Sequence, residues 1–334
     1  MSDPVTAQFA QLISTITIEN VPVAAAEQIR WRVLKAFATI LSADINQRKT
    51  ISRVTATTGP GTSTRSGSQA ALGSTGYAQH QPVLSALSTG AILDIRQPGA
   101  QMHAGPMTVD SAIIAAAWSL VQASQGSGHL FMSALAAGYL ATEVLASLPD
   151  SDHSQQWRSG VVNATVSAAA AAARVSQLPA NATLHAMGFA VAQAAQLAKN
   201  AAIAGQGGAL AADASVCQDQ ADLPGPGRAA MDAVLSAHMA ALGGQCLPVL
   251  INQLQQAMSA LNLNRAPLDA WAAIQRNRTS SGIEAIREFR RQVASAISDD
   301  EAETIIGLIL RLEHTAPGEL TTYVNERIGS PLDS

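Results

Sequence analysis

Apolar residues recur at helical spacing along most of this chain. Within residues 23–44, Ile29, Val33, Phe37 and Ile40 fall on one helical face. Pro22 comes just before this segment, where a missing backbone N–H costs nothing. Alternating apolar and polar runs, which are typical of strands, are rare, so the pattern predicts an all-α fold. The helices expected on this basis are residues 5–15, 23–44, 81–91, 108–125, 128–148, 163–177, 182–204, 227–242, 247–261, 267–276, 282–296 and 299–314.

Glycine, proline and small polar residues separate these helices. Residues 50–76 are dominated by Thr, Ser and Gly and predict a loop with one short extended piece at 51–55. Residues 94–107 and 205–227 are rich in glycine and proline, and we expect the first of them to be an ordered loop. Ser298 and Glu301 form an S-x-x-E pattern, which predicts a capping box at the start of the last helix.

Composition adds to this picture without changing the fold class. Hydrophobic residues make up 48% of the 334 residues and charged residues only 13%, so a large core and a surface covered partly by another subunit are expected. A net charge of −4 gives no electrostatic case for binding nucleic acid or an anionic membrane. Two cysteines, no recognisable signal peptide and no run of about 18 apolar residues favour a cytoplasmic protein.

Three segments, in order along the chain, resemble the helical domain of the MmgE/PrpD family, which includes 2-methylcitrate dehydratase and cis-aconitate decarboxylase. Residues 90–146 contain Gln101-Met102-His103-Ala104-Gly105-Pro106 where the family has a short H-P-[SGA] stretch, followed by an Ala-rich helix and a Gly138-Tyr139 helix. Residues 156–196 contain the alanine run that ends in Arg174. Residues 227–248 begin with Gly227-Arg228-Ala229-Ala230, which is similar to the family's G-R-A-A helix.

The resemblance implies a large Ala-rich helical region over residues 1–248, but several family features are missing. Only 86 residues follow Pro248, so we expect residues 249–334 to replace the family's α/β lid and to close one helical domain spanning 1–334. Residues 93–97 keep one acid of the family's H-x-L-D-x-D-D motif. Arg158 stands in place of the histidine of G-F-H, and the lid lysine has no counterpart.

His103 is the leading catalytic candidate, because the resemblance makes it the family's proton-shuttling histidine. It lies between Pro98-Gly99 and Gly105-Pro106, which restrict the backbone and favour one position for its side chain. Asp94, nine residues earlier, could orient the imidazole or act as a base. The structural alternatives are a surface or capping histidine and a solvated loop acid.

Further residues are candidates for holding a substrate. Arg96 and Arg158 could grip a carboxylate through two hydrogen bonds, and Lys199 could bind an anion from a helix that is otherwise poor in charge. Tyr77 and Gln97 are possible substrate contacts in loops. Surface salt bridges and a snorkelling lysine are the alternatives. No pair of residues has metal-ligand spacing, and no phosphate-loop motif occurs, so no metal and no cofactor are expected.

These observations predict a cofactor-independent lyase or isomerase of dehydratase, decarboxylase or cyclase type. Its substrate would be a carboxylated small molecule, and secondary-metabolite biosynthesis is a setting that fits the missing lid. The alternative is a non-catalytic MmgE/PrpD-like scaffold or small-molecule binding protein. A pocket lined by His103 would favour the enzyme, and a filled core would favour the scaffold. Ala-rich helices with few charges also predict a homodimer.

Overall fold

A computed structural model describes residues 4–43, 82–93, 107–148, 160–206, 225–258, 262–263, 265–276 and 282–320. These residues are about 85% helical and contain no strand, which confirms the predicted all-α fold. The α-helices are α1 (Pro4–Thr15), α2 (Val23–Ser42), α4 (Pro82–Leu93), α5 (Met107–Ala123), α6 (Gly128–Ala146), α8 (Gly160–Val175), α9 (Ala180–Gln206), α11 (Gly225–Ala241), α12 (Pro248–Met258), α13 (Ala266–Arg276), α14 (Gly282–Val293) and α15 (Asp299–Leu310), with short 3-10 helices η1 (Ile18–Asn20) and η3 (Leu312–His314).

The helix ends depart from the sequence prediction by a few residues, and backbone geometry explains two of the departures. Helix α5 stops at Ala123, because Gln125 adopts a left-handed φ of 51° and the Gly126 N–H donates to the Val121 carbonyl at 2.9 Å. Gln177, with φ 52°, ends α8 in the same way. These are the tightened endings that follow a residue in the left-handed region. The Ser298–Glu301 capping box is present as predicted.

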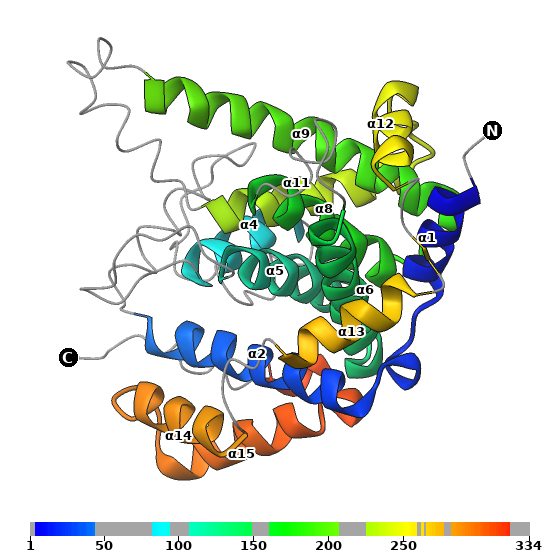
Figure 1. Cartoon of the computed structure of the whole chain (residues 1–334). Coiled ribbons are helices and arrows are strands. Elements are labelled where there is room, and N and C mark those ends of the chain that lie inside the picture. Colours follow the sequence, from blue (N-terminus) through cyan, green and yellow to red (C-terminus); the bar gives the residue numbers. More distant parts are fainter. Residues whose placement is uncertain are drawn as a thin grey trace.

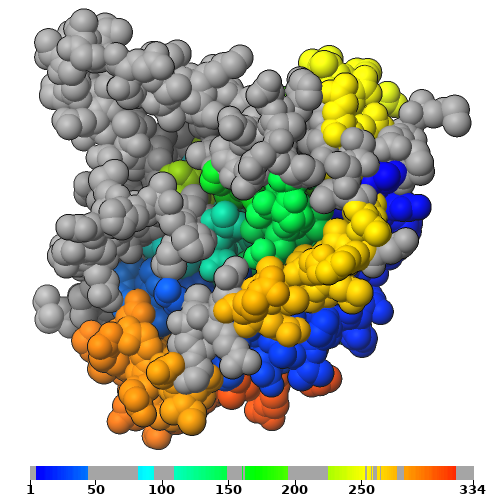
Figure 2. Space-filling model, viewed as in Figure 1, coloured from blue at the N-terminus to red at the C-terminus, as the bar shows by residue number. Residues whose placement is uncertain are grey.

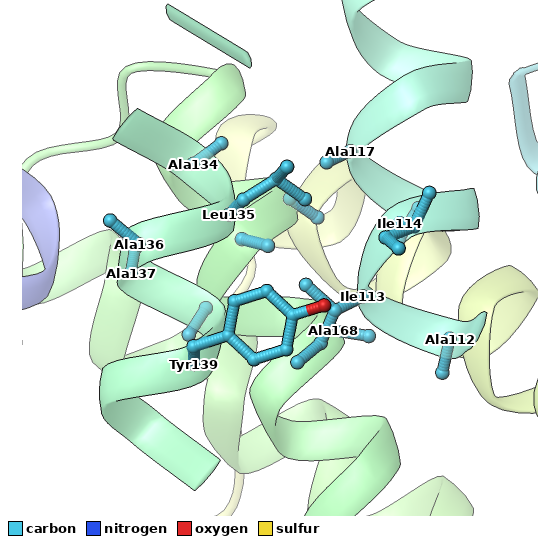
Figure 3. Packing of buried hydrophobic residues seen from close by; sticks show 14 of the residues in the cluster. Ala112, Ile113, Ile114, Ala117, Ala134, Leu135, Ala136, Ala137, Tyr139 and Ala168 are labelled. Carbon is cyan, nitrogen blue, oxygen red and sulfur yellow. The ribbon is translucent and has the colours of Figure 1, made fainter. Parts of the chain in front are cut away.

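Helix α8 lies at the centre of the molecule and contacts α5, α6, α9 and α11 (Figure 1). Its alanines at 168–173 have no exposed surface. Because alanine ends at Cβ, neighbouring helices can approach α8 closely and still fill the space between them. Figure 3 shows this packing at Ala168, with Ile113 of α5 and Tyr139 of α6 close by.

Helices α4 and α11 approach even more closely, at a pair of glycines. A Cβ placed on Gly90 would lie 2.6 Å from the Gly227 Cα, and one placed on Gly227 would lie 2.5 Å from the Leu87 carbonyl oxygen. Both distances are shorter than van der Waals contact allows. The Gly227-Arg228-Ala229-Ala230 motif therefore has a packing role here, since only glycine fits at the crossing.

Helix α2 lies across α5 and α6 and is itself covered by C-terminal helices. Trp118 of α5 packs edge-on against Phe37 of α2 and Phe131 of α6, with ring centroids 5.1 and 5.5 Å apart. Helix α2 also contacts α13, α14 and α15, and Figure 2 shows α13, in gold, over the blue surface of α2. The Gly128 N–H of α6 also donates to the Thr315 carbonyl at 3.1 Å. That these helices stand in place of a lid stays a prediction.

One described helix, α6, is long and apolar enough to cross a membrane by length and composition alone. In the structure, 72% of its apolar window is buried inside the protein. A buried core helix passes the same test, so the apolar character of α6 is accounted for by its packing against α5 and α8.

The glycine crossing yields the first prediction. Gly90→Ala should lower the free energy of unfolding by about 1–3 kcal/mol, the usual cost of forcing an extra carbon into a packed core. The matched control is Gly307→Ala in α15, where a Cβ would meet nothing closer than the Arg311 guanidinium at 3.9 Å. Alanine there should raise stability by about 0.5–1 kcal/mol. Urea unfolding followed by circular dichroism measures both, and equal effects would contradict the close crossing.

Candidate functional site

The side chains of the site residues predicted from the sequence are not among those that the structure describes. His103, Asp94, Arg96, Gln97, Arg158 and Tyr77 lie outside the described residues, and Lys199 lies in α9 but its side chain is not described. Their roles therefore stay predictions. The structure describes the two helix ends that flank residues 94–106, because Leu93 ends α4 and Met107 begins α5.

A half-open hollow lies where these two helix ends meet α2, and we call it the α2–α5 hollow. It is shallow, with a volume of about 20 Å³, which is room for one or two water molecules. Its lining comes from three helices: Arg32, Lys35, Ala36 and Thr39 of α2, Leu93 of α4, and Asp110, Ser111 and Ile114 of α5. The α2 residues are three, four and seven positions after Arg32, so helical geometry puts them on one face.

Arg32 is the central charged residue of this region. Its Nη1 donates to Asp110 Oδ1 at 3.0 Å, and its guanidinium carbon lies 4.6 Å from the centroid of the Tyr139 ring. Only 10% of the Arg32 side chain and 21% of the Asp110 side chain are exposed. An ion pair and a cation–π contact thus hold the guanidinium between α5 and α6.

Glu143 of α6 completes a group of four residues, which we call the Arg32 cluster: Arg32, Asp110, Tyr139 and Glu143. Burial raises the pKa of Asp110 and that of Glu143, and in both cases it outweighs the opposing pull of Arg32. Burial lowers the pKa of Arg32 and is the largest single influence on it, but Asp110, Tyr139 and Glu143 together outweigh burial, so the net shift is upward. Burial and Asp110 together raise the pKa of Tyr139 well above its usual value. The cluster thus holds one permanent cation beside two carboxyl groups that ionise reluctantly.

Arg32 Nε and Tyr139 Oη are buried and make no hydrogen bond of ordinary geometry, although the Tyr139 hydroxyl lies close enough to Arg32 and Asp110 to affect their pKa values. In Figure 3 the Tyr139 hydroxyl points toward Ile113 of α5, an apolar neighbour. Unpaired buried donors are uncommon in folded proteins and cost stability.

Sequence reasoning missed this cluster. Arg32 and Lys35 fall between the core positions of α2, where the sequence alone does not distinguish them from solvated residues of an amphipathic helix. Asp110 lies in the first turn of the helix after the His103 loop, where an acid has the ordinary role of favouring the helix start. A signal was available in Tyr139, since a tyrosine buried in an apolar helix usually has a polar partner for its hydroxyl.

Other polar residues from the family-like segments have structural roles. Gln193 Nε2 of α9 donates to Ser236 Oγ of α11 at 2.9 Å. Arg228 Nε lies 3.0 Å from both carboxylate oxygens of Asp232, which is buried. These contacts join α9 to α11 and pair a buried acid. Among the described residues, no three His, Cys, Asp or Glu side chains gather as metal ligands would.

Glu143 offers a test of the cluster's electrostatics. A carboxyl group whose folded pKa is raised contributes stability below its unfolded pKa and loses it as pH rises through the folded value. The unfolding free energy of the wild type should therefore fall as pH increases above about 4.5. This fall should be smaller in Glu143→Gln, and the part that remains in the variant is attributed to Asp110. Urea titrations from pH 4 to 7 would measure the slope.

Glu19 is the matched control, because its shift has the opposite sign. A hydrogen bond from Thr17, with further contributions from its own backbone and His129, lowers the pKa of Glu19 from 4.5 to about 2. Its stabilising effect is complete above pH 4.5 and is lost as pH falls through about 2. Glu19→Gln should leave the slope above pH 5 unchanged. The same slope change in both variants would contradict the burial of Glu143.

Comparison with known proteins agrees with this architecture. The family model of the MmgE/PrpD N-terminal domain matches residues 7–258, which include the α2–α5 hollow and helices α5, α6, α8, α9 and α11. No curated protein matches the chain. The family consists of lyases whose members are dehydratases and decarboxylases, and only its N-terminal domain is found here. Because the match covers most of the chain, the protein belongs to the MmgE/PrpD family.

Proposed function

We propose that the protein is a cofactor-independent lyase or isomerase that acts on a small carboxylated molecule. The observation that carries this proposal is the α2–α5 hollow, where Arg32 and Lys35 line a recess beside Asp110. Cationic side chains in the lining suit an organic acid. Family membership supplies the reaction class.

The proposed chemistry starts with removal of a proton from the carbon beside a substrate carboxylate. The electron pair left on that carbon is delocalised into the carboxylate, and a nearby cation stabilises the extra charge. Water can then leave from the neighbouring carbon, or the proton can return to the other face. In a decarboxylase, the bond to the carboxylate breaks instead, CO2 leaves and the carbon takes up a proton.

We propose His103 as the residue that moves the proton, with Asp94 as its partner. Covalent connection to the hollow supports this assignment. Asp94 directly follows Leu93, which lines the hollow. His103 precedes Met107 by four residues, so its Cα can lie no farther than about 14 Å from the start of α5. Arg96, Arg158, Lys199, Tyr77 and Gln97 remain the proposed substrate contacts outside the described side chains.

A small-molecule binding protein or scaffold without catalysis is the second candidate. The departures from the family pattern favour it, since Arg158 replaces a histidine and the lid lysine has no counterpart. A protein of this kind would keep the helical core and the charged hollow while lacking proton transfer.

Exchange of substrate hydrogen with solvent separates the two candidates. The chain would be incubated in D2O with mono-, di- and tricarboxylic acids, and loss of the C–H signals would be followed by proton NMR. We expect exchange with at least one acid, and a drop of about 100-fold or more in His103→Ala, the usual share of a general base. His314→Ala, an exposed histidine that does not line the hollow, is the control. Binding without exchange in the wild type would favour the non-catalytic candidate.

We also propose that the chain forms a homodimer through α11. Leu235 and Met239 of this helix, and Leu242 just after it, are 39%, 37% and 90% exposed at spacings that put them on one helical face. A mass of twice 34.4 kDa is expected by light scattering. Leu242→Glu should give a monomer, and Ile283→Glu, at a 73% exposed position on α14, should not. A wild-type monomer at micromolar concentration would contradict this proposal.

A further inference from the structure

The C-terminal helices lie outside the matched family domain but share its hydrophobic core. The family model ends at residue 258, whereas α13, α14, α15 and η3 all follow that residue. Ile274, Phe289, Ile309 and Leu312, one from each of these elements, are at most 1% exposed and belong to the same buried cluster as the matched domain. These elements are therefore part of the core and are not an appendage to it.

One attachment point joins the last described turn of the chain to the start of α6. The Gly128 N–H donates to the Thr315 carbonyl at 3.1 Å. A Cβ on Gly128 would overlap the carbonyl oxygens of Leu312 and Thr315, so only glycine allows this approach. The Thr315 hydroxyl lies 3.1 Å from the Leu308 carbonyl oxygen and 3.0 Å from that of Arg311, and its hydrogen bonding to them fixes the turn.

A second attachment point joins the same turn to α2. The Arg30 guanidinium donates to both carboxylate oxygens of Glu313, from Nη2 to Oε1 at 2.7 Å and from Nε to Oε2 at 3.2 Å. This is the paired geometry in which arginine holds a carboxylate most firmly. The two side chains are only 15% and 19% exposed, so solvent and salt screen the pair weakly.

Helix α14 holds α2 at two other places (Figure 1). A Cβ on Gly282, the first residue of α14, would lie 2.7 Å from Cζ2 of Trp31, so the helix start approaches the indole ring closely. Near the other end of α14, Gln292 Nε2 donates to Oγ of Ser42, the last residue of α2, at 3.1 Å. The two helices therefore run side by side and in the same direction over this stretch.

Arg32 lies two residues after Arg30 but contacts the opposite side of the molecule. It donates to Asp110 of α5 and lies over the Tyr139 ring of α6. Residues two apart project from nearly opposite sides of a helix, because each turn holds 3.6 residues. Any displacement of α2 that separates Arg30 from its carboxylate partner therefore also moves Arg32 relative to Asp110 and the ring.

We propose that residues 282–320 form a strap that fixes the position of α2 and so holds Arg32 in its contacts with α5 and α6. Glu313 and Gly128 are the positioning residues, since Glu313 holds α2 and Gly128 admits the strap to the start of α6. Helix α2 also supplies one wall of the α2–α5 hollow, so the strap supports that wall from behind. The strap concerns the position of a helix and does not depend on the reaction proposed above.

Two variants of the full chain test the strap, each with a matched control. Glu313→Gln removes the charge that holds Arg30, and Glu303→Gln removes a charge from an exposed ion pair between α14 and α15. Gly128→Ala places a carbon where the strap lies, and Gly307→Ala adds the same carbon to α15, where the nearest atom is 3.9 Å away. Circular dichroism checks that each variant is folded.

The readout is the position of Arg32, measured by NMR on protein labelled in its arginines. An aromatic ring shifts the resonances of nuclei above its face upfield, and the Arg32 guanidinium carbon lies 4.6 Å from the Tyr139 ring centroid. Arg32→Lys, which lacks the signal, identifies it. We expect Glu313→Gln and Gly128→Ala to abolish the upfield shift, and both controls to retain it. A substitution that only lowers stability would leave the signal of the folded protein in place.

A double variant isolates the pair between Arg30 and Glu313. In an Arg30→Gln background the pair is already broken, so adding Glu313→Gln should move the Arg32 signal no further. Wild-type Arg32 signals in both Glu313→Gln and Gly128→Ala would overturn the strap, and so would equal changes in the two controls. If Gly128→Ala does not fold, Glu313→Gln decides alone, and a further change in the double variant would overturn the role given to the pair.

Discussion

Close packing of small residues around α8 is the constraint on which the rest of the structure depends. The buried alanines of α8 let α5 and α6 both lie against it, and this brings these two helices side by side. The Gly90–Gly227 crossing draws α4 against α11 in the same manner. Such a core has little tolerance for added volume, because no flexible side chain separates the backbones. The positions of the ends of α4 and α5 follow from this packing, and these ends frame the hollow.

Helix α2 connects the core to the candidate site. Its apolar face meets Trp118 through Phe37, and the C-terminal helices cover another side of it. Arg32 is then held where a single side chain reaches Asp110 on α5 and the Tyr139 ring on α6. Burying an ion pair of this kind costs desolvation energy that the attraction between the charges only partly offsets. The buried ion pair is therefore weak evidence for a contribution to stability.

Much of this fold could be predicted from the sequence, for local reasons. The helical spacing of Ile29, Val33, Phe37 and Ile40, together with Gly/Pro punctuation, located the α-helices to within a few residues. The capping box at Ser298 could also be predicted, because all its parts lie within four residues. The end of α5 at the left-handed Gln125 could not be predicted, because glutamine has no strong preference for that conformation.

The Arg32 cluster could not be predicted, because its members lie far apart in the chain. Arg32 and Asp110 are separated by 78 residues, and no motif links them. Their contact depends on how α2 crosses α5. Side-chain volumes determine that crossing, and the spacing of apolar residues along the sequence does not reveal it. The residues that family resemblance singled out, above all His103 and Asp94, lie outside the described part of the chain. The sequence therefore supplied one half of the candidate site and the structure another.

The most direct test of the account is a crystal structure of the full chain with succinate. We expect succinate beside the α2–α5 hollow, at the ends of α4 and α5, with Arg32 still stacked on Tyr139. Succinate bound elsewhere would contradict the central claim that the site lies where α2, α4 and α5 meet.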